Sequence, residues 1–420
     1  MDEAHLTLEA LARLLSGGMT YEELILRVVP HLLERCPVCR ETHREILRLQ
    51  GELKHWNEEI VVTEGLEAPR LWARLSKLSY EAQSEQVEAD PAMQTWGLCQ
   101  LLLKKSLDAG FENPTSAVNF ANLAVKISGR LGNVYHPEWV KDLRARALAH
   151  LGNARRVLGE LRSADDAFGF AETYAREGTG DPRLQAEILD LQGSLRRAQR
   201  RFDEALACVN NAFAIYKECE DSHGMGKTTL AKVQVLKESG QLEKAIELLE
   251  HNEIDQLLEP RLFAYARYNL LGCLPLAGRF KDAENLLPEV RQLFGAWEQP
   301  VNLLRLRWTE ANIALGLGRI SESEAIFLEV QSSFLERRMA YDAALVSLDL
   351  SLVYLREGKI SELKQLAGDL VLLFESRDVH REALGALYLF KKACEEERLT
   401  EQTVSRLVEM LRRGQPAREA

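Results

Sequence analysis

Residues 159–168 read GELRSADDAF, and this pattern of a turn residue followed by an amphipathic segment recurs along the chain. The copies begin at Gly159, Arg200 (RRFDEALACV), Gly240 (GQLEKAIELL), Gly278 (GRFKDAENLL), Gly318 (GRISESEAIF) and Gly358 (GKISELKQLA), with a degenerate seventh at Arg398 (RLTEQTVSRL). Their spacings are 41, 40, 38, 40, 40 and 40 residues. A fixed period of this length indicates stacked repeats, none of which buries its apolar face alone.

Each copy places small and apolar residues at fixed distances from its turn residue. The residues two positions later are Leu161, Phe202, Leu242, Phe280, Ile320 and Ile360; those five later are Ala164, Ala205, Ala245, Ala283, Ser323 and Leu363; those nine later are Phe168, Val209, Leu249, Leu287, Phe327 and Ala367. Small residues also lie seven positions before the turn, at Gly152, Gly193, Ala311 and Ser351. These offsets fit a second helix packed closely on a first, with glycine at the left-handed end of the first helix. The sequence therefore predicts an all-α protein, an α-solenoid of about seven helix–turn–helix repeats with a period of about 40 residues.

Several of these residues resemble the tetratricopeptide-repeat signature. Gly152, Ala164, Phe168 and Ala171 match its Gly, Ala, Phe and Ala, and Gly193, Ala205 and Ala212 repeat part of the match. The family unit has about 34 residues, so the longer unit here implies longer helices or loops. The resemblance covers residues 137–412, with a degenerate unit at 91–131, and implies a scaffold for protein–protein interaction.

The composition excludes several classes of protein. The chain has 420 residues, is 46% hydrophobic and 28% charged, and carries 53 Lys and Arg against 64 Asp and Glu, a net charge of −11. Such a chain buries a large core, and its negative charge disfavours bulk binding to nucleic acid or anionic lipid. We therefore expect no nucleic-acid and no membrane partner. The N-terminal MDEAHLTLEA lacks the basic and apolar regions of a signal peptide, which predicts a cytoplasmic protein.

The N-terminal segment contains a candidate zinc site. Cys36 and Cys39 form a Cys-x2-Cys pair, a spacing at which two thiolates bind tetrahedral zinc. His31 lies near the end of the preceding expected helix, His5 opens the first helix, and His43 lies one turn along the next. The sequence predicts Zn²⁺ bound by His5, His31, Cys36 and Cys39, with His43 in reserve for His5. The alternative is two ordinary thiols beside surface histidines.

The first 45 residues resemble the zinc-binding domain of bacterial anti-sigma factors, which show an early His or Cys and then His-x3-Cys-x2-Cys. One extra residue separates His31 from Cys36 here. The resemblance places the early ligand at His5, and it implies a structural or redox-responsive zinc and, in some relatives, contact with a sigma factor. With the repeats, it predicts a zinc-binding helical module at 1–50, linking helices at 51–90, the solenoid at 91–412 and a disordered tail at 413–420.

Residues 224–231 read GMGKTTLA, which looks like the phosphate-binding loop of P-loop ATPases. That loop requires G-x-x-x-x-G-K-[ST] after a strand, but Asp221 occupies the position of the first glycine. The preceding segment has a helical pattern, so we expect a polar loop leading into a first helix, and no nucleotide site. No other group of residues forms a catalytic motif, and we predict a protein that is not an enzyme.

The repeat register predicts a partner surface on the first helices, which line the concave face in this repeat class. Its members are Arg146, Asn153, Arg156, Arg197, Lys227, Lys237, Tyr265, Tyr268, Arg305, Trp308 and Asn312. A basic and then aromatic surface suits an acidic or extended peptide, although charged helix positions are often only solvated. The predicted function is a non-enzymatic interaction scaffold. The alternative is an anti-sigma-type transcriptional regulator in which the zinc module contacts a sigma factor.

Overall fold

The computed structural model describes residues 58–110, 113–132, 135–250, 260–295, 300–337 and 339–375, together with 390–392, 400, 402 and 404. These residues form α-helices, one short 3-10 helix and connecting turns. The chain divides into two compact units, one ending at Asp221 and the other beginning at Ser222. We call them unit 1 and unit 2. The division falls within the segment that the sequence predicts to be one solenoid.

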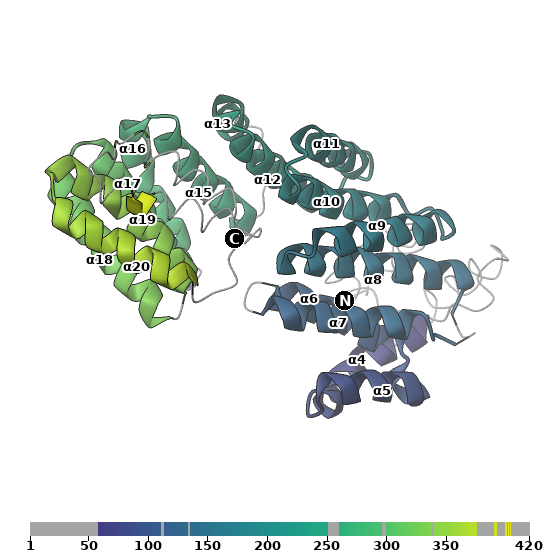
Figure 1. Ribbon diagram of the computed structural model, residues 1–420. Coiled ribbons are helices and arrows are strands. Elements are labelled where there is room, and N and C mark those ends of the chain that lie inside the picture. Colours follow the sequence, from purple (N-terminus) through teal and green to yellow (C-terminus); the bar gives the residue numbers. More distant parts are fainter. Residues whose placement is uncertain are drawn as a thin grey trace, which may run out of the picture. The chain divides into compact units, whose positions relative to one another are not determined.

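Six helices of unit 1 pack in consecutive pairs (Figure 1). The pairs are α6 (Trp96–Ala109) and α7 (Pro114–Ser128); α8 (Pro137–Leu158) and α9 (Leu161–Arg176); and α10 (Pro182–Ala198) and α11 (Phe202–Glu218). Before them come α4 (Glu58–Leu75) and α5 (Tyr80–Ala89), which pack on α6 and α7 respectively. The 3-10 helix η3 (Pro91–Met93) leads into α6. Contacts also join α4 to α6, α6 to α8 and α8 to α10. The expected linking helices therefore lie against α6 and α7 rather than against each other.

Local sequence sets where several of these helices begin. The side chains of Ser79, Thr95, Asn113 and Asp181 accept hydrogen bonds from the first backbone N–H groups of α5, α6, α7 and α10. These groups have no partner within the helix, so a polar cap stabilises the start. Proline occupies the first turn of α7, α8 and α10, where its missing N–H costs nothing.

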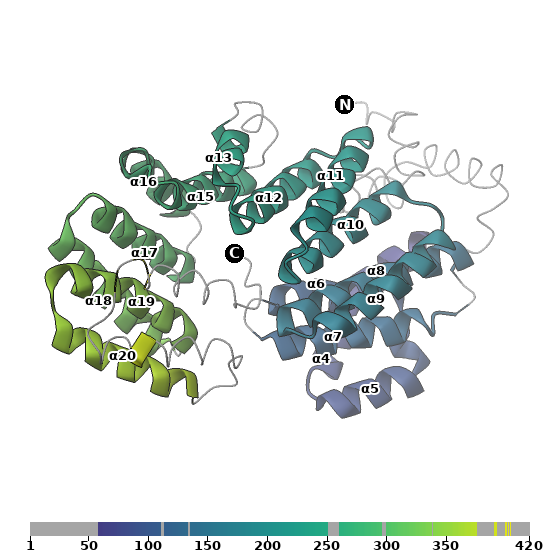
Figure 2. The same ribbon diagram turned by 45° about the horizontal axis from the view of Figure 1, so that its top comes forward.

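Unit 2 continues the same arrangement, and Figure 2 shows α17–α20 stacked side by side. Its described helices are α12 (Ser222–Glu238), α13 (Leu242–Glu250), α15 (Pro260–Leu276), α16 (Phe280–Gly295), α17 (Pro300–Gly316), α18 (Ile320–Glu336), α19 (Ala340–Glu357) and α20 (Ile360–Glu375). In each repeat, the apolar residue predicted two positions after the turn is the first residue of the second helix. These second helices are α9, α11, α13, α16, α18 and α20.

The six predicted turn residues all have positive φ. The angles are 93° at Gly159, 63° at Arg200, 81° at Gly240, 76° at Gly278, 78° at Gly318 and 68° at Gly358. At each turn two backbone N–H groups reach back to the end of the first helix, as in Gly159 to Arg156 at 3.0 Å and Glu160 to Arg155 at 2.9 Å. This is the Schellman arrangement, so the predicted role of the turn residue is confirmed.

Residues of each repeat can be numbered from its turn residue, so that position −7 lies seven before it and position +9 nine after it. Gly152 and Phe168 occupy these two positions in the first repeat, and a Cβ on Gly152 would lie 2.8 Å from the Phe168 ring. Gly193 and Val209 show the same approach, also at 2.8 Å. The small residue at −7 therefore lets the first helix of a repeat lie against the apolar residue at +9 of the second.

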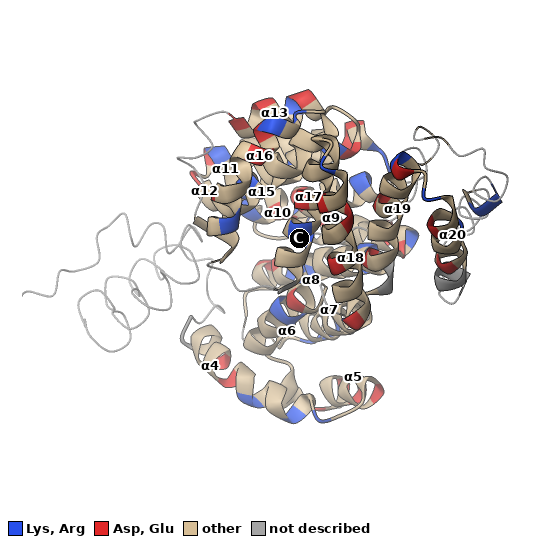
Figure 3. Ribbon diagram, turned by 90° about the vertical axis from the view of Figure 1, so that its left-hand side faces the viewer, with Lys and Arg blue, Asp and Glu red and all other residues tan. Residues whose placement is uncertain are grey.

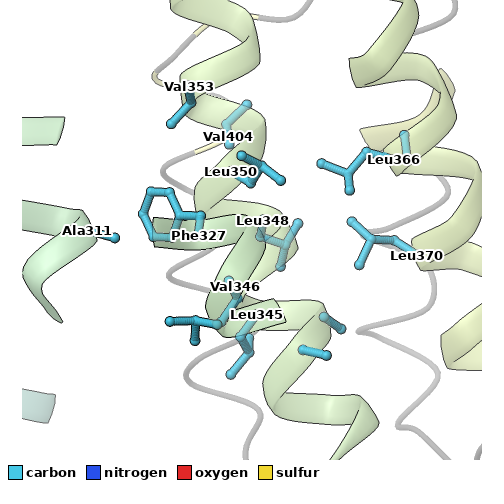
Figure 4. Packing of buried hydrophobic residues seen from close by; sticks show 14 of the residues in the cluster. Ala311, Phe327, Leu345, Val346, Leu348, Leu350, Val353, Leu366, Leu370 and Val404 are labelled. Carbon is cyan, nitrogen blue, oxygen red and sulfur yellow. The ribbon is translucent and has the colours of Figure 1, made fainter. Parts of the chain in front are cut away.

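Figure 4 shows this packing in unit 2, where Ala311 faces Phe327 beside Val346 and Leu350 of α19. The Ser323 hydroxyl donates to the Ala311 carbonyl at 2.9 Å, so the polar small residue at position +5 is satisfied. Phe390 and Val404 join the same cluster. They lie on either side of Arg398, so this part of the degenerate seventh copy contributes to the core.

The GMGKTTLA segment lies inside a helix. Helix α12 begins at Ser222, and the Thr228 hydroxyl donates to the Gly224 carbonyl at 2.8 Å, four residues earlier in the same helix. The expected polar loop before the helix is therefore wrong, because these residues already form its first turns. Gly224 and Gly226 are buried there.

Candidate functional site

The predicted partner residues fall at four positions of the repeat, −13, −10, −6 and −3, which are spaced to share one face of a first helix. We call the side chains at these positions, with their direct partners, the first-helix row. Position −13 carries Arg146, Lys227, Tyr265 and Arg305; −10 carries Tyr268 and Trp308; −6 carries Asn153 and Asn312; −3 carries Arg156, Arg197 and Lys237.

In unit 1 the row is an internal ion pair. The Arg146 Nε donates to Glu187 Oε2 at 2.9 Å, and His150 Nε2 lies 3.0 Å from the other oxygen of the same carboxylate. Glu187 occupies position −13 of the next repeat, so the contact joins α8 to α10. Burial raises the pKa of Glu187, but the lowering by Arg146 and His150 is larger. The pKa of Glu187 therefore lies below its usual value of 4.5.

Two predicted contact residues of unit 1 are buried. Arg156 is 1% exposed and Arg197 is 6% exposed. Both Arg156 Nε and Nη2 donate to Asn153 Oδ1, at 3.0 and 2.8 Å, so the Asn153 carbonyl is used within its own helix. The expectation that Arg156 and Arg197 project into a groove that a partner enters is therefore wrong, because both side chains are buried.

In unit 2 the row carries aromatic side chains that pack against phenylalanines of the second helices. Tyr265 and Tyr268 pack on Phe294 with ring centroids 6.0 and 4.9 Å apart, and Trp308 packs edge-on against Phe334 at 6.3 Å. Phe294 and Phe334 both occupy position +16, so two successive repeats use the same device. Tyr265, Tyr268 and Trp308 are half-buried, which leaves part of each ring accessible.

Acidic residues of α19 fix the neighbouring side chains of α17. The Trp308 indole Nε1 donates to Asp349 Oδ2 at 2.7 Å, and Asn312 Nδ2 donates to the same oxygen at 3.3 Å. Arg305 lies 3.7 Å from Asp342. Both aspartates are buried. Each contact joins one first helix to the next, as Arg146 and Glu187 do in unit 1.

The remaining predicted members are placed as follows. Lys227 is exposed on α12, and Lys237 is half-buried near Gly272 of α15, where a Cβ would lie 3.6 Å from its Nζ. Tyr268 forms a hydrogen bond with Thr309 and faces the charge of Arg305, but burial raises its pKa more than these contacts lower it. Gln234 Nε2 donates to Asn269 Oδ1 at 2.7 Å, which links α12 to α15.

Sequence reasoning missed the acidic half of the row. Glu187, Asp342 and Asp349 lie one repeat further along the chain than the side chains they bind. The separations in sequence are 41, 37 and 41 residues, close to the repeat period. Arg146 and Glu187 both occupy position −13, so comparing equivalent positions in successive repeats would have paired them. Asp342 and Asp349 lie at −16 and −9, three residues before and one residue after the positions of their partners, so that comparison alone would not have found them.

The candidate zinc ligands His5, His31, Cys36 and Cys39, and the reserve His43, lie outside the described residues. Among the residues that are described, no group of three or more His, Cys, Asp and Glu side chains is placed to hold a metal ion.

Burial raises the pKa of the Cys99 thiol to about 12 and also raises that of Cys273. No described helix is both long and apolar enough to cross a membrane.

Comparison with known proteins supports the architecture. No protein-family model and no curated protein matches the chain. Solved structures do. Aspartyl phosphate phosphatase F from Bacillus subtilis has a TM-score of 0.52 at 10% identity, with 96% of this chain and 97% of that chain covered. A Rap protein complexed with Competence and Sporulation Factor has a TM-score of 0.50 at 16% identity, with 81% and 99% covered.

The chain has a tetratricopeptide-like helical repeat fold. A signal-transduction ATPase from Pyrococcus horikoshii with a tetratricopeptide-repeat sensor gives a TM-score of 0.51 at 12% identity, with 98% of this chain and 65% of that chain covered. At these identities the similarity shows the repeat fold alone. The sequence prediction of an all-α solenoid is confirmed.

Proposed function

We propose that the chain is a non-enzymatic scaffold that binds a protein or peptide segment through the first-helix row of unit 2. The observation that carries the proposal is the set of half-buried aromatic residues Tyr265, Tyr268 and Trp308 on adjacent first helices. Each ring is held by a second aromatic ring or a buried carboxylate. Rings that are already ordered lose little conformational freedom when a partner covers them, and such anchors dominate binding energy.

The charges of the row favour a partner segment with both apolar and polar side chains over a purely acidic segment. Arg146 is bound to Glu187, and Arg305 lies beside Asp342, so neither presents an isolated positive charge. Lys227 is exposed at one edge of the row and takes part in an interaction of its own. We therefore propose an extended segment whose apolar side chains anchor on the rings. The fold similarity to a Rap protein complexed with Competence and Sporulation Factor is consistent with a bound protein or peptide.

Affinity capture from native lysate, followed by identification of the bound protein, tests this proposal. Tyr265→Ala and Trp308→Ala should each weaken capture of the partner about thirtyfold, since truncating an aromatic anchor costs about 2 kcal/mol or more. Lys227→Ala should weaken it less, and raised salt should reproduce only that loss. Trp308→Phe is the matched control and should weaken capture less than Trp308→Ala, because it keeps an aromatic ring in place while removing the Nε1–H donor to Asp349 and part of the indole's contact area.

The N-terminal zinc site is a second proposal, supported by the Cys-x2-Cys spacing of Cys36 and Cys39 with His31 and His5 nearby. Elemental analysis of protein prepared without chelator should give one zinc per chain, and replacing both cysteines by serine should remove it. If that double variant abolishes partner capture while Tyr265→Ala and Trp308→Ala leave it normal, the unit 2 surface is not the binding site. A sigma factor as the captured protein would then establish the anti-sigma alternative.

A further inference from the structure

Helix α18 carries an exposed apolar stripe that the first-helix row does not use. The stripe consists of Ser321, Ala325, Leu328, Ser332 and Leu335, all exposed. Leu328 is 42% exposed and Leu335 is 49% exposed. The spacings of 4, 3, 4 and 3 residues are those of the contact positions of a coiled-coil heptad. Two leucines separated by two helical turns, about 10.5 Å, alternate with small residues that let another helix approach.

The stripe is specific to this repeat. Leu328 and Leu335 occupy positions +10 and +17. At position +10 the other second helices of the repeats from Gly159 to Gly358 carry Gly169, Asn210, Glu250, Pro288 and Gly368, and at position +17 the described ones carry Arg176, Lys217, Gly295 and Glu375. In the repeats before α18 these positions are exposed, so leucine at both of them in α18 is not required by the packing of a repeat.

The exposed area extends onto α17. Arg307 of α17 reaches Glu329 of α18 at 3.1 Å, and Leu303 lies one helical turn before Arg307 on the same face of its helix. Leu303 is 41% exposed. Leu303 therefore lies on the side of α17 that reaches α18, so exposed leucines are found on both helices, and grouped exposed apolar residues are typical of an interaction surface.

Glutamates flank the stripe along its length. Helix α18 contains Glu322, Glu324, Glu329 and Glu336 and no Lys or Arg, and Figure 3 colours its acidic residues red. Glu322, Glu329 and Glu336 are exposed and repeat every seven residues beside the leucines. Glu324 lies on the other side. In heptad terms these are the flanking positions whose charge selects a partner helix.

Neighbouring cations do not cancel this charge. Arg307 contacts Glu329, but it also binds Glu310 at 2.6 Å. Arg319 lies 3.5 Å from Glu322 and also contacts Glu284. Lys359 binds Glu324 at 2.6 Å and Glu357 at 2.7 Å. Each of these cations is shared between two carboxylates, although Arg291 also binds Glu310 at 2.7 Å. The exposed Arg337 lies just beyond the helix, and carboxylates still outnumber cations beside the stripe.

A second copy of α18 is a poor occupant for this surface. In an antiparallel pair Glu322, Glu329 and Glu336 would face the same residues of the other copy, and in a parallel pair they would face Glu324 and Gln331. Like charges oppose pairing in both orientations. We propose that the stripe binds a basic amphipathic helix of another protein, with large apolar residues over Ala325 and Ser332 and Lys or Arg beside the glutamates.

The test uses the full chain and a designed helical peptide of about three heptads, with Leu at the contact positions and Lys at the flanking positions. Fluorescence anisotropy measures its affinity for wild type and for the double variant Leu328→Ser, Leu335→Ser. Because both leucines are exposed, the melting temperature should not change. Affinity should fall about tenfold or more, since each buried leucine side chain accounts for about tenfold in an equilibrium constant.

Phe170→Ser is the matched control, because Phe170 is 60% exposed on α9 and belongs to unit 1. That variant, and Tyr265→Ala in the first-helix row, should bind the basic peptide as wild type does. A peptide with Glu in place of the flanking Lys should bind more weakly than the basic one. Equal affinity of the double variant and wild type, or equal affinity for the basic and acidic peptides, would overturn the proposal. So would a wild-type dimer in sedimentation analysis that the double variant abolishes.

Discussion

The first-helix rows of unit 1 and unit 2 occupy the same repeat positions but serve different roles. In unit 1 an arginine, a histidine and a glutamate bind one another, and two further arginines are buried. In unit 2 the row carries half-buried aromatic residues whose rings pack on the phenylalanines at position +16. A repeat position therefore fixes where a side chain lies, whereas its neighbours one repeat away decide whether it holds the stack together or remains available to a partner.

The largest expected effect separates the two rows by stability. Arg146→Met removes the cation from Glu187, which is half-buried, and leaves that carboxylate with His150 alone. Urea unfolding should show a loss of about 2 kcal/mol, since an ion pair broken from one side leaves an uncompensated charge. Lys227→Met in unit 2 is the control and should change the free energy of unfolding by less than about 0.5 kcal/mol, because Lys227 is exposed.

The pH dependence of that loss gives the comparison a sign. The folded pKa of Glu187 lies below its usual 4.5, so its contribution to stability is present above about pH 4.5 and is lost as pH falls through the folded pKa. The wild-type free energy of unfolding should therefore fall more steeply below pH 4.5 than that of Arg146→Met. Parallel curves for the two proteins would show that Arg146 does not hold the Glu187 pKa down.

The next effect concerns the aromatic row of unit 2. Trp308→Phe keeps a ring against Phe334 but removes the donor to the buried Asp349 carboxylate. We expect thermal or urea unfolding to show a loss of about 1–2 kcal/mol, with Asn312 still donating to that carboxylate. Tyr265→Ala should lower the free energy of unfolding by less than it weakens the free energy of partner binding. If every variant of the row lowers stability and binding together, the rings of unit 2 are structural in the way that the unit 1 charges are.

A smaller effect, an increase in stability, is expected at the left-handed turn, which occurs in the repeats of both units. Arg200 has φ 63° at a position where the other five turns carry glycine. Arg200→Gly should stabilise the chain by about 0.5–1 kcal/mol, because a side chain is strained in this conformation, although the contact of Arg200 with the Phe202 ring is lost. Gly240→Ala, with φ 81°, should destabilise it. Chemical denaturation of both variants measures the pair of values.

The smallest expected effect is none at all. ATP should not change the melting temperature of wild type or of Lys227→Ala, since Gly224 and Gly226 are buried within α12 and form no phosphate loop. A ligand present at 100 times its Kd would stabilise by about 2.7 kcal/mol. An ATP-dependent rise in melting temperature that the variant loses would show that α12 binds nucleotide after all.

The fold was predictable because its determinants recur. A glycine at a left-handed turn and small and apolar residues at −7, +5 and +9 repeat often enough to be recognised without any knowledge of distant contacts, and the positive φ at all six turns confirms them. The site was predictable only in part. The row residues were identified by register, but exposure depends on neighbours that a single helix projection omits, as Arg156 and Arg197 show. The start of α12 before Gly224 was missed because glycine and polar residues were read as a loop.

The turn that closes each first helix also bears on how such a chain changes length. All six turns have one residue in the left-handed conformation, five times glycine and once Arg200, and the same pair of returning N–H groups, so cuts made at any two of them leave ends of matching geometry. Excising residues 279–318, for example, would join Gly278 to Arg319 and leave an intact turn with α18 as its second helix. Gain or loss of a whole repeat thus alters one interface between neighbours, whereas the same deletion from a single-core domain would remove part of its only interior.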